Sequence, residues 1–207
     1  MYKYTKWILD RFLALFLLLL LALLMLIIGI LVKIDSKGPV LFIQKRSGKD
    51  GKEFKLYKFR SMVENNDVHD FKTHDQMTRV GKVLRDLSLD ELPQLFNIIK
   101  GEMSFIGPRP WITDYSVYFT DNQRRRLEVL PGLTGYAQCS GRNHLSIKEK
   151  INLDIYYVDH VSFKMDIKVI VGTVKTVLSK ESVNVSKGGI KAELDELREQ
   201  WNGKIPV

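Results

Sequence analysis

Two adjacent carboxylates, Asp90 and Glu91, are the residues in this 207-residue chain best suited to chemistry. Ser88 followed three residues later by Glu91 has the spacing of a capping box, and Asp90 is an alternative N-cap. Pro93 is tolerated only near a helix start, so it favours a helix that begins at Asp90. A helix start attracts phosphate oxygens, and Mg²⁺ can bridge phosphate and carboxylate. By itself the pair suits a helix cap, which is the commoner case, or a phosphate site with a divalent cation.

Basic residues around this pair are the expected partners of the phosphate oxygens. The chain contains neither a Walker motif nor a G-x-G-x-x-G loop, so side chains must hold the phosphates. Arginine suits bidentate contacts and lysine acts as a point charge. Pro108 and Pro110 fix the backbone on both sides of Arg109, which favours that arginine. The candidates for substrate binding are Lys58, Arg60, Arg85, Arg109, Pro110 and Arg142, although each basic residue could instead lie on a solvated face.

Two strands and several helices are expected to position these residues. Val40–Arg46 and Phe54–Met62 have strand patterns, and Asp50-Gly51 between them is a hairpin signal. A short basic helix over Thr78–Asp86 would bring Arg85 to the carboxylate pair, and the helix after the pair should stop at Gly101. The sequence thus predicts an α/β (α+β) fold of short helices around a small antiparallel sheet. Further helices are expected over residues 121–130, 148–158, 167–178 and 192–201.

Three features of the C-terminal half have more than one interpretation. The arginine run that begins at Arg124 is interpreted as a lipid-headgroup patch or a solvated helix face. The broad apolar face of residues 167–178 suits either a buried helix or a helix in a membrane interface. Asp154 and Asp166 are expected to have a supporting function, either touching a metal or pairing with arginines.

The N-terminal residues 1–34 are expected to be a membrane anchor, followed by a catalytic domain over residues 35–207. An uncharged run from Phe12 to Val32 would form a helix of about 30 Å, enough to cross a hydrocarbon core. It is longer than a signal peptide's apolar region and lacks a cleavage site, so it should be retained. The positive-inside rule places both basic flanks in the cytoplasm, which a re-entrant helix satisfies and a straight span does not. The basic residues of the two flanks are Lys3, Lys6, Arg11, Lys33, Lys37, Lys45, Arg46 and Lys49.

Net charge and cysteine content limit the classes of partner and the cellular compartment that are expected. The formal net charge of +8 suits an anionic partner such as lipid headgroups or a nucleotide diphosphate. Nucleic acid is not expected, because no helix-turn-helix, zinc-finger or RNA-binding signature accompanies the charge. Cys139 is the only cysteine, which suits a reducing cytosolic face. The four histidines lack metal-ligand spacing, so Asp90 and Glu91 are the candidate metal ligands.

Four segments together carry a family resemblance. They are FKLYKFRSM at 54–62, LSLDELPQLFNIIKGEMSFIGPRP at 87–110, LPGLTGYAQCSGRN at 130–143 and LDIYYVDHVSFKMDIKVI at 153–170. In this order they resemble the monotopic phosphoglycosyl transferases, the bacterial sugar transferase family. The resemblance implies transfer of a phosphosugar from a nucleotide sugar, expected to be a UDP-sugar, to polyprenyl phosphate.

The resemblance also assigns roles to single residues. Asp90 would be the nucleophile that forms an acyl phosphate, Glu91 its partner, and Mg²⁺ the cofactor. The Pro-Arg-Pro motif at Arg109 would lie at the nucleotide-sugar pocket. The family's re-entrant helix bends at a Ser-Pro pair, whose place is taken here by Ala22 and Leu23. The catalytic domain would rest on the cytoplasmic face of the bacterial inner membrane.

Two other classes of function compete with this interpretation. A membrane-anchored nucleotide-sugar hydrolase or phosphatase could use the same aspartate with water as the acceptor. A non-catalytic scaffold could bind anionic lipid through its basic surface, but such a protein gains nothing from paired acids. The transferase is the function that the sequence favours.

Overall fold

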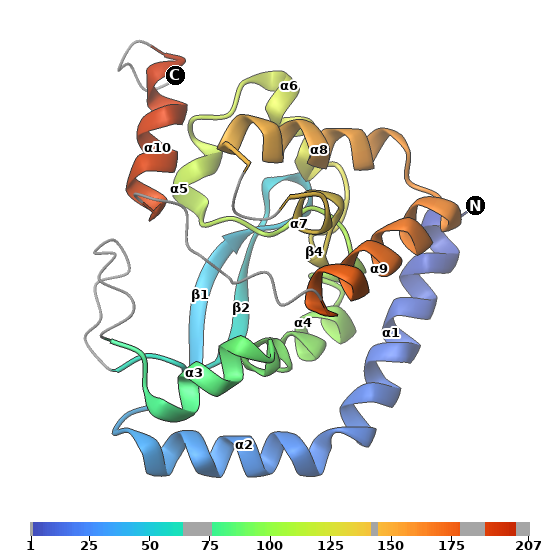
Figure 1. The fold of residues 1–207 in the computed structure, drawn as a ribbon. Helices are drawn as coiled ribbons and strands as arrows, with labels where there is room; N and C mark the ends of the chain where they lie inside the picture. Colours follow the sequence, from blue (N-terminus) through green and yellow to red (C-terminus); the bar gives the residue numbers. More distant parts are fainter. Residues whose placement is uncertain (1, 64–75, 142–144, 179–188, 202–207) are drawn as a thin grey trace.

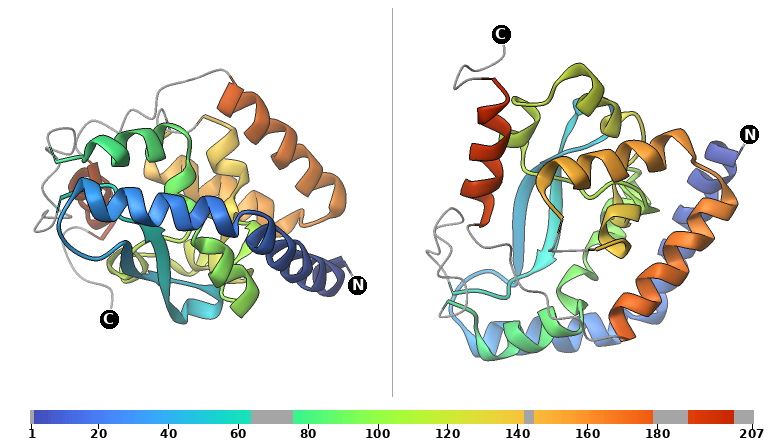
Figure 2. Two further views of the ribbon diagram at one scale, coloured as in Figure 1. Left: turned by 90° about the horizontal axis from the view of Figure 1, so that it is seen from below. Right: turned by 45° about the horizontal axis from the view of Figure 1, so that its top comes forward.

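Helices and two small sheets make up the fold, which confirms the predicted α/β class (Figure 1). The computed structural model describes residues 2–63, 76–141, 145–178 and 189–201. The N-terminal helices run along one edge of the domain, and the antiparallel pair of strands β1 and β2 lies between short helices (Figures 1 and 2).

The apolar N-terminal segment forms two helices that meet at a sharp bend. Helix α1 spans Tyr2–Leu20 and helix α2 spans Ala22–Asp35, and Figure 1 shows them running in different directions. Together they are long and apolar enough to cross a membrane, and their most apolar 18-residue window is only 11% buried. The break lies at Leu21, where φ is −95° and ψ is 3°. It adjoins the position at which the resemblance placed a hinge, although Ala22 and Leu23 contain no helix breaker.

Packing against two different parts of the domain accounts for a bend without proline. Ala14 of α1 lies in a cluster with Leu95 and Ile98, whereas Ile28 of α2 packs with side chains that include Leu84. Each half of the segment therefore follows its own apolar surface. Tertiary contacts, which a local search for proline does not detect, impose the direction of each helix.

Polar contacts hold both ends of this segment against the same domain. The Tyr2 hydroxyl donates to Asp166 over 2.6 Å, and Lys6 Nζ lies 2.9 Å from the same carboxylate. At the other end, Asp35 Oδ2 accepts from the backbone N–H of Val80 over 2.9 Å. Asp166 thus has the expected supporting function, although its partners are tyrosine and lysine rather than arginine.

The predicted hairpin is present as β1, Leu41–Ser47, and β2, Glu53–Phe59. They pair antiparallel, with Leu41 opposite Phe59 and Ser47 opposite Glu53. The 3-10 turn η1 (Lys49–Gly51) closes the loop, with positive φ at Asp50 and Gly51. Strand β2 ends earlier than the predicted Met62, because the carbonyl of Ser61 instead accepts from the Thr78 N–H.

Helix α3, Arg79–Asp86, begins at that junction as predicted. The Thr78 hydroxyl caps it by accepting from the Gly81 N–H over 2.9 Å. A Cβ at Gly81 would lie 2.1 Å from the Ser61 carbonyl oxygen, so only glycine allows this close crossing. The cap and the glycine fix the direction in which α3 carries Arg85.

The predicted start of the next helix is wrong. Asp90 and Glu91 lie in the 3-10 turn η2, Leu89–Glu91, and helix α4 spans Gln94–Lys100 with Pro93 at its N-cap position. Ser88 has a left-handed backbone with φ of 57° and makes no capping hydrogen bond, so the capping-box prediction fails. The predicted stop at Gly101 is confirmed, since its φ is 81°.

A second sheet is parallel and was not expected. Strands β3 (Ser104–Ile106) and β4 (Gly132–Thr134) pair with Ser104 opposite Gly132. Gly107 and Gly132 cross so closely that a Cβ on Gly132 would lie 2.1 Å from the Gly107 nitrogen. This crossing joins the Pro-Arg-Pro loop to the segment that begins at Pro131.

The remaining helices cover the hairpin and the second sheet. A single helix over 121–130 is replaced by α6 and the 3-10 turn η3, while the other predicted helices are present with shifted ends. Helix α10 gives the C-terminal segment a structural function, since Leu194 and Leu197 pack with Tyr115 and Phe119. The bounds are α5 Thr113–Ser116, α6 Asp121–Arg124, η3 Arg125–Leu127, α7 Tyr136–Cys139, α8 Ile147–Asp159, α9 Phe163–Leu178 and α10 Gly189–Glu199.

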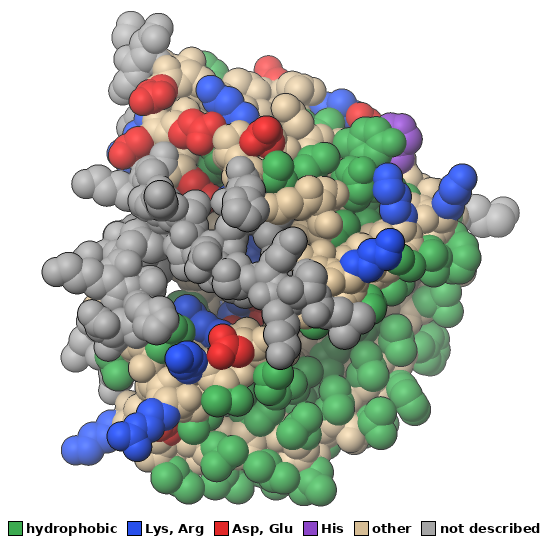
Figure 3. Space-filling model, viewed as in Figure 1, with side chains coloured by type: hydrophobic (Ala, Val, Ile, Leu, Met, Phe, Trp, Pro, Cys, Tyr) green, Lys and Arg blue, Asp and Glu red, His purple; other side chains and the backbone are tan. Residues whose placement is uncertain are grey.

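Apolar side chains on α9 lie on the surface rather than in the core. Ile170 and Val174 are exposed, and Phe163 is 67% exposed, whereas Val169 on the opposite face is fully buried. Figure 3 shows apolar side chains gathered over the N-terminal helices, and the start of α9 contacts the start of α1 through Asp166. Of the two interpretations of this helix, the exposed face favours contact with a membrane interface.

Candidate active site

Asp90 and Glu91 lie between the end of α3 and the start of α4, facing strand β2. The Glu91 carboxylate is 2.6 Å from Lys58 Nζ and 3.2 Å from an Nη atom of Arg109. Asp90 is buried, and its carboxylate is 4.0 Å from Lys58 Nζ. The structure therefore brings the two predicted carboxylates together with two of the predicted basic residues.

Asn97 fixes α4 against β2 and thereby sets the distance between the carboxylates and Lys58. Its side chain is fully buried, accepts from the Tyr57 N–H over 3.2 Å and donates to the Lys55 carbonyl over 2.7 Å. An amide can both donate and accept, which is what the exposed backbone edge of a strand requires. Asn97 was not predicted from the sequence, because nothing local distinguishes it from a surface asparagine.

Arg46 joins this site from strand β1. Arg46 is opposite Phe54 and Phe42 is opposite Lys58, so Arg46 and Lys58 extend from the same face of the hairpin. Arg46 donates to Gln44 Oε1 over 2.5 Å and to the Pro110 carbonyl over 3.3 Å. From the sequence, Arg46 was considered only as one of the basic residues that flank the membrane anchor. The hairpin register across Asp50-Gly51 was the signal that could have placed it on the same face as Lys58.

Of the other predicted basic residues, Arg85 reaches the site and Arg60 is used elsewhere. Arg85 donates to the Ser61 hydroxyl over 2.9 Å, and its charge stabilises the ionised form of Asp90. Arg60 is buried and donates to the carbonyls of Ser36 and Lys37, at 2.7 and 2.6 Å. It therefore fastens the connector after α2, contrary to the substrate contact expected for it. Arg142 lies outside the described residues.

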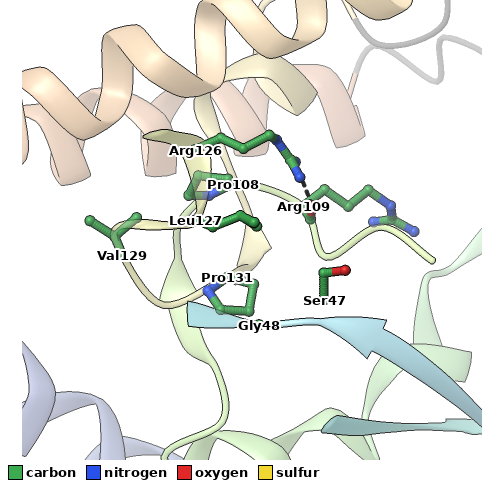
Figure 4. A pocket seen from close by; sticks show the side chains of 8 residues that line it. All are labelled: Ser47, Gly48, Pro108, Arg109, Arg126, Leu127, Val129 and Pro131. Atoms are coloured by element: carbon green, nitrogen blue, oxygen red, sulfur yellow. Dashed lines mark hydrogen bonds between the residues drawn. The ribbon is translucent and has the colours of Figure 1, made fainter. Parts of the chain in front are cut away.

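The Pro-Arg-Pro loop is held by a buried arginine. Arg126 is 2% exposed and donates to the Arg109 carbonyl over 2.8 Å (Figure 4). It also pairs with Asp154 over 2.7 Å. Its guanidinium also lies 4.0 Å from the Trp111 ring centre. This placement corrects the expectation that the whole arginine run is solvated or meets lipid; Arg124 alone of the three is fully exposed. It confirms the pairing expected of Asp154.

A small hollow lies behind the loop. In Figure 4 the Arg109 side chain extends away from it, so the guanidinium is available to Glu91. Four of the hollow's eight lining residues are apolar, and the Arg126 beside it is already paired with Asp154, which suits packing rather than phosphate binding. It is lined by Ser47, Gly48, Pro108, Arg109, Arg126, Leu127, Val129 and Pro131.

The two neighbouring carboxylates have opposite electrostatic environments. Burial raises the pKa of Asp90 above its ordinary value, because the attraction of Lys58 only partly offsets the lost solvation. Burial acts in the same direction on Glu91, but Lys58 and Arg109 outweigh it and lower its pKa from 4.5 to about 2. Glu91 is thus a permanently charged member of an ion-pair cluster, whereas Asp90 is a more basic and less tightly paired carboxylate.

The donor atoms fit a magnesium ion that shares its coordination with a phosphate. Mg²⁺ is usually held by one or two carboxylates, with water and substrate phosphates completing the shell. Asp90 and Glu91 offer such a pair, and among the described residues no group of three or more His, Cys, Asp or Glu is arranged to hold a metal alone. Asp90 in particular is a buried carboxylate whose described cation partner is 4.0 Å away, which leaves it able to take a further cation.

The site as a whole carries more positive than negative charge. Arg46, Lys58, Arg85 and Arg109 surround two carboxylates, so two positive charges remain unmatched within this cluster. Such an excess suits an anionic ligand of the diphosphate class. A carboxylate nucleophile beside it could form a covalent bond to phosphorus.

Comparison with known proteins agrees with this chemistry. The sequence model of a family described as bacterial sugar transferase matches residues 1–180, which leaves α10 outside the match. An uncharacterized sugar transferase of Bacillus subtilis, EpsL, is 43% identical over 180 residues, or 86% of this chain and 89% of that protein.

Two longer relatives have more specific names. A UDP-N-acetylgalactosamine-undecaprenyl-phosphate N-acetylgalactosaminephosphotransferase of Aeromonas hydrophila is 39% identical over 72% of this chain. A UDP-glucose:undecaprenyl-phosphate glucose-1-phosphate transferase of Xanthomonas campestris is 38% identical over 84% of it. The aligned region is 38% of the length of each of these two proteins.

Proposed function

The chain belongs to the bacterial sugar transferase family, and we propose that it transfers a phosphosugar from a UDP-sugar to polyprenyl phosphate through a covalent intermediate on Asp90. The names of two longer relatives, which pair UDP-sugars with undecaprenyl phosphate, support these substrates. The observation that carries the proposal is the unequal pairing of the two carboxylates. Glu91 is bound by two cations, whereas Asp90 is buried, has one cation at 4.0 Å among the described residues and keeps an oxygen able to attack.

The first half of the reaction follows from this geometry. An Asp90 oxygen attacks the phosphorus that bears the sugar, and the bond from that phosphorus to the oxygen of UMP breaks. The products are UMP and an acyl phosphate that carries the sugar. Lys58 and Arg109, held by Glu91, lie where they can neutralise the phosphate oxygens as charge shifts to the leaving group.

The second half returns the enzyme to its starting state. A phosphate oxygen of the lipid attacks the same phosphorus, the bond to Asp90 breaks, and the carboxylate is regenerated as the lipid diphosphosugar leaves. Mg²⁺ bound at Asp90 and Glu91 would neutralise the diphosphate and polarise the phosphorus. Splitting the reaction in two avoids direct attack of one phosphate on another while both substrates are bound.

The proposal includes a re-entrant anchor with the domain on the cytoplasmic face. The two ends of the apolar segment contact one domain, at Asp166 and at Val80, and the helix bends at Leu21 between them. A straight span would place those ends on opposite sides of a hydrocarbon core about 30 Å thick. The exposed apolar face of α9 supports a domain that lies on the membrane surface.

Labelling a single cysteine near the N-terminus tests this topology. We would replace Cys139 with serine, change the exposed Lys3 to cysteine, and treat intact cells with an impermeant maleimide. A re-entrant anchor predicts labelling only after lysis. Labelling of intact cells would mean that the anchor spans the membrane.

The nucleophile is tested by comparing Asp90→Asn with Asp86→Asn. Both replace one carboxylate with an amide, but Asp86 is an exposed residue at the end of α3. With a panel of UDP-sugars and undecaprenyl phosphate, Asp90→Asn should lower UMP release by at least about 10³-fold, while Asp86→Asn retains activity. Near-normal turnover in purified Asp90→Asn would falsify the assignment.

Acceptor and metal dependence separate the transferase from a hydrolase. The wild-type protein should release one equivalent of UMP per enzyme without lipid acceptor and continue only when polyprenyl phosphate is added. Chelation should stop the reaction and Mg²⁺ restore it. Continuous UMP release without an acceptor would instead identify a nucleotide-sugar hydrolase.

A further inference from the structure

Arg46 is a charged side chain whose hydrogen-bonding capacity the protein does not use fully. Its Nε is buried without a partner, and its bond to the Pro110 carbonyl is long at 3.3 Å. Across the residues that the structure describes, no carboxylate lies within ion-pair distance of its guanidinium. The contrast is Arg126, which pairs with Asp154 through two hydrogen bonds.

The surroundings of Arg46 are unfavourable for a cation without a ligand. Burial, followed by repulsion from Arg109, lowers the pKa of Arg46 to about 10, and attraction from Glu91 is weaker than either. Arg46 nevertheless stays charged at neutral pH. A partly desolvated guanidinium beside a second guanidinium costs free energy unless an anion offsets it. This cost is understandable at a site where substrate supplies the anion.

The position of Arg46 indicates the kind of anion. It shares a hairpin face with Lys58, and Arg109 and the Pro110 carbonyl lie beside it. The planar fork of arginine matches a phosphate with two parallel hydrogen bonds. We propose that Arg46 binds a phosphate group of the substrate, next to the one that reacts at Asp90.

Of the two substrates that carry phosphate, the nucleotide-sugar donor is the better match. Strand β1 starts at the connector from α2 and carries Arg46 to its opposite end, away from the apolar α2 (Figure 1). A lipid phosphate would approach from the side of the exposed anchor, whereas a soluble diphosphate can reach the far end of the hairpin. This inference rests on the proposed function and adds to it a binding residue for the nucleotide diphosphate.

The test compares Arg46→Gln and Arg46→Lys with the matched variant Lys45→Gln. Lys45 is the neighbouring residue on the same strand, extends from the other face and is exposed, so its variant removes one charge without touching the site. Calorimetry with UDP and Mg²⁺ measures binding without requiring transfer. The KM values for the UDP-sugar and for undecaprenyl phosphate are measured separately.

We expect Arg46→Gln to weaken UDP binding and raise the donor KM by about tenfold or more. Arg46→Lys, which keeps the charge and loses the fork, should fall between it and the wild type. Lys45→Gln should stay within about twofold in both measurements. The acceptor KM should be unchanged in all three variants.

Three results would overturn the proposal in distinguishable ways. Unchanged UDP affinity and donor KM in Arg46→Gln would show that Arg46 binds no donor phosphate. A raised acceptor KM with normal UDP affinity would assign the residue to the lipid phosphate instead. If Arg46→Gln fails to fold, as judged by its melting curve, unchanged UDP affinity in a folded Arg46→Lys variant decides against the proposal. UDP binding without UMP release in the wild type would instead refute the proposed function.

Discussion

Two clusters of arginine and carboxylate side chains meet at Arg109, and they differ in how completely their charges are matched. Behind the loop, Arg126 and Asp154 form a buried pair in which the guanidinium also holds the Arg109 carbonyl. In front of it, four cations surround Asp90 and Glu91 and leave an excess of positive charge. Residue type alone therefore does not distinguish a structural cluster from a functional one, because both contain arginines and carboxylates. The balance of charge within the cluster does distinguish them.

The buried pair should dominate stability, and breaking it is the largest effect that we expect. Arg126→Met leaves Asp154 buried without a partner, which should lower the free energy of unfolding by about 3–5 kcal/mol. The double variant Arg126→Met/Asp154→Leu should recover most of that loss, because no lone charge remains. Denaturant unfolding in detergent measures both. Equal stability of the single and double variants would mean that the pair is not a matched unit.

The front cluster should respond more strongly in activity than in stability. Glu91→Gln removes the charge that holds Lys58 and Arg109, and we expect turnover to fall by about 10²–10³-fold. The melting temperature should also fall, because the lowered pKa of Glu91 reflects a stabilising ion pair. The fall should be smaller than in Arg126→Met, because the Glu91 side chain is 18% exposed and that of Asp154 only 3%. Glu128→Gln, an exposed carboxylate paired with Arg125, is the control. If Glu91→Gln lost as much stability as Arg126→Met, the cluster around Asp90 and Glu91 would be structural in the same way as the Arg126–Asp154 pair.

The pH dependence of stability and activity should distinguish Asp90 from Glu91. Because burial raises the pKa of Asp90, its ionised form costs folding free energy, and wild-type stability should rise as the pH falls through that raised pKa. Glu91 acts oppositely: its stabilisation is complete above about pH 4.5 and is lost as the pH falls toward 2. Activity should fall on the acidic side as Asp90 takes up a proton.

Melting curves of Asp90→Asn against pH check this assignment. The variant should melt above the wild type at pH 7, and the difference should shrink as the pH falls toward the ordinary range of an aspartate. A variant that melts below the wild type at pH 7 would contradict the cost assigned to the ionised Asp90.

The smallest effect is expected at the surface. Arg125 pairs with Asp159 and Glu128 on the exposed side of the same arginine run. Solvent screens such pairs, so Arg125→Ala should leave both the melting temperature and turnover at wild-type values within error. A clear loss in either measurement would mean that Arg125, like Arg126, belongs to the cluster of matched charges.

Local signals in the sequence were enough to predict much of the fold. The Asp50-Gly51 turn and the Gly101 stop act over a few residues, and both have the predicted function. The helix predicted from Thr78 is also present, with Thr78 as its cap. The start of α4 was wrong because Ser88 adopts a left-handed backbone, which places the dyad in a 3-10 turn instead of a regular helix. The bend at Leu21 could not be predicted from proline, because packing on two surfaces produces it.

The chemistry of the site could be predicted from the sequence, but the full set of residues that form it could not. Paired acids with nearby basic residues pointed to Asp90, Glu91, Lys58 and Arg109, which the structure brings together. Arg60 was misplaced because its partners are backbone carbonyls at 36 and 37, which carry no sequence signature. Arg46 was missed because it reaches the site only through the hairpin register.

The hydrogen bond from Arg126 to the Arg109 carbonyl has a consequence for substitutions at position 109. Because the acceptor belongs to the backbone, the bond persists whichever side chain occupies position 109. The half-exposed guanidinium can therefore be exchanged for another group while the loop keeps its course. A substitution at position 109 should thus remove the proposed phosphate contact and leave the support of the loop intact, so the two contributions can be measured separately.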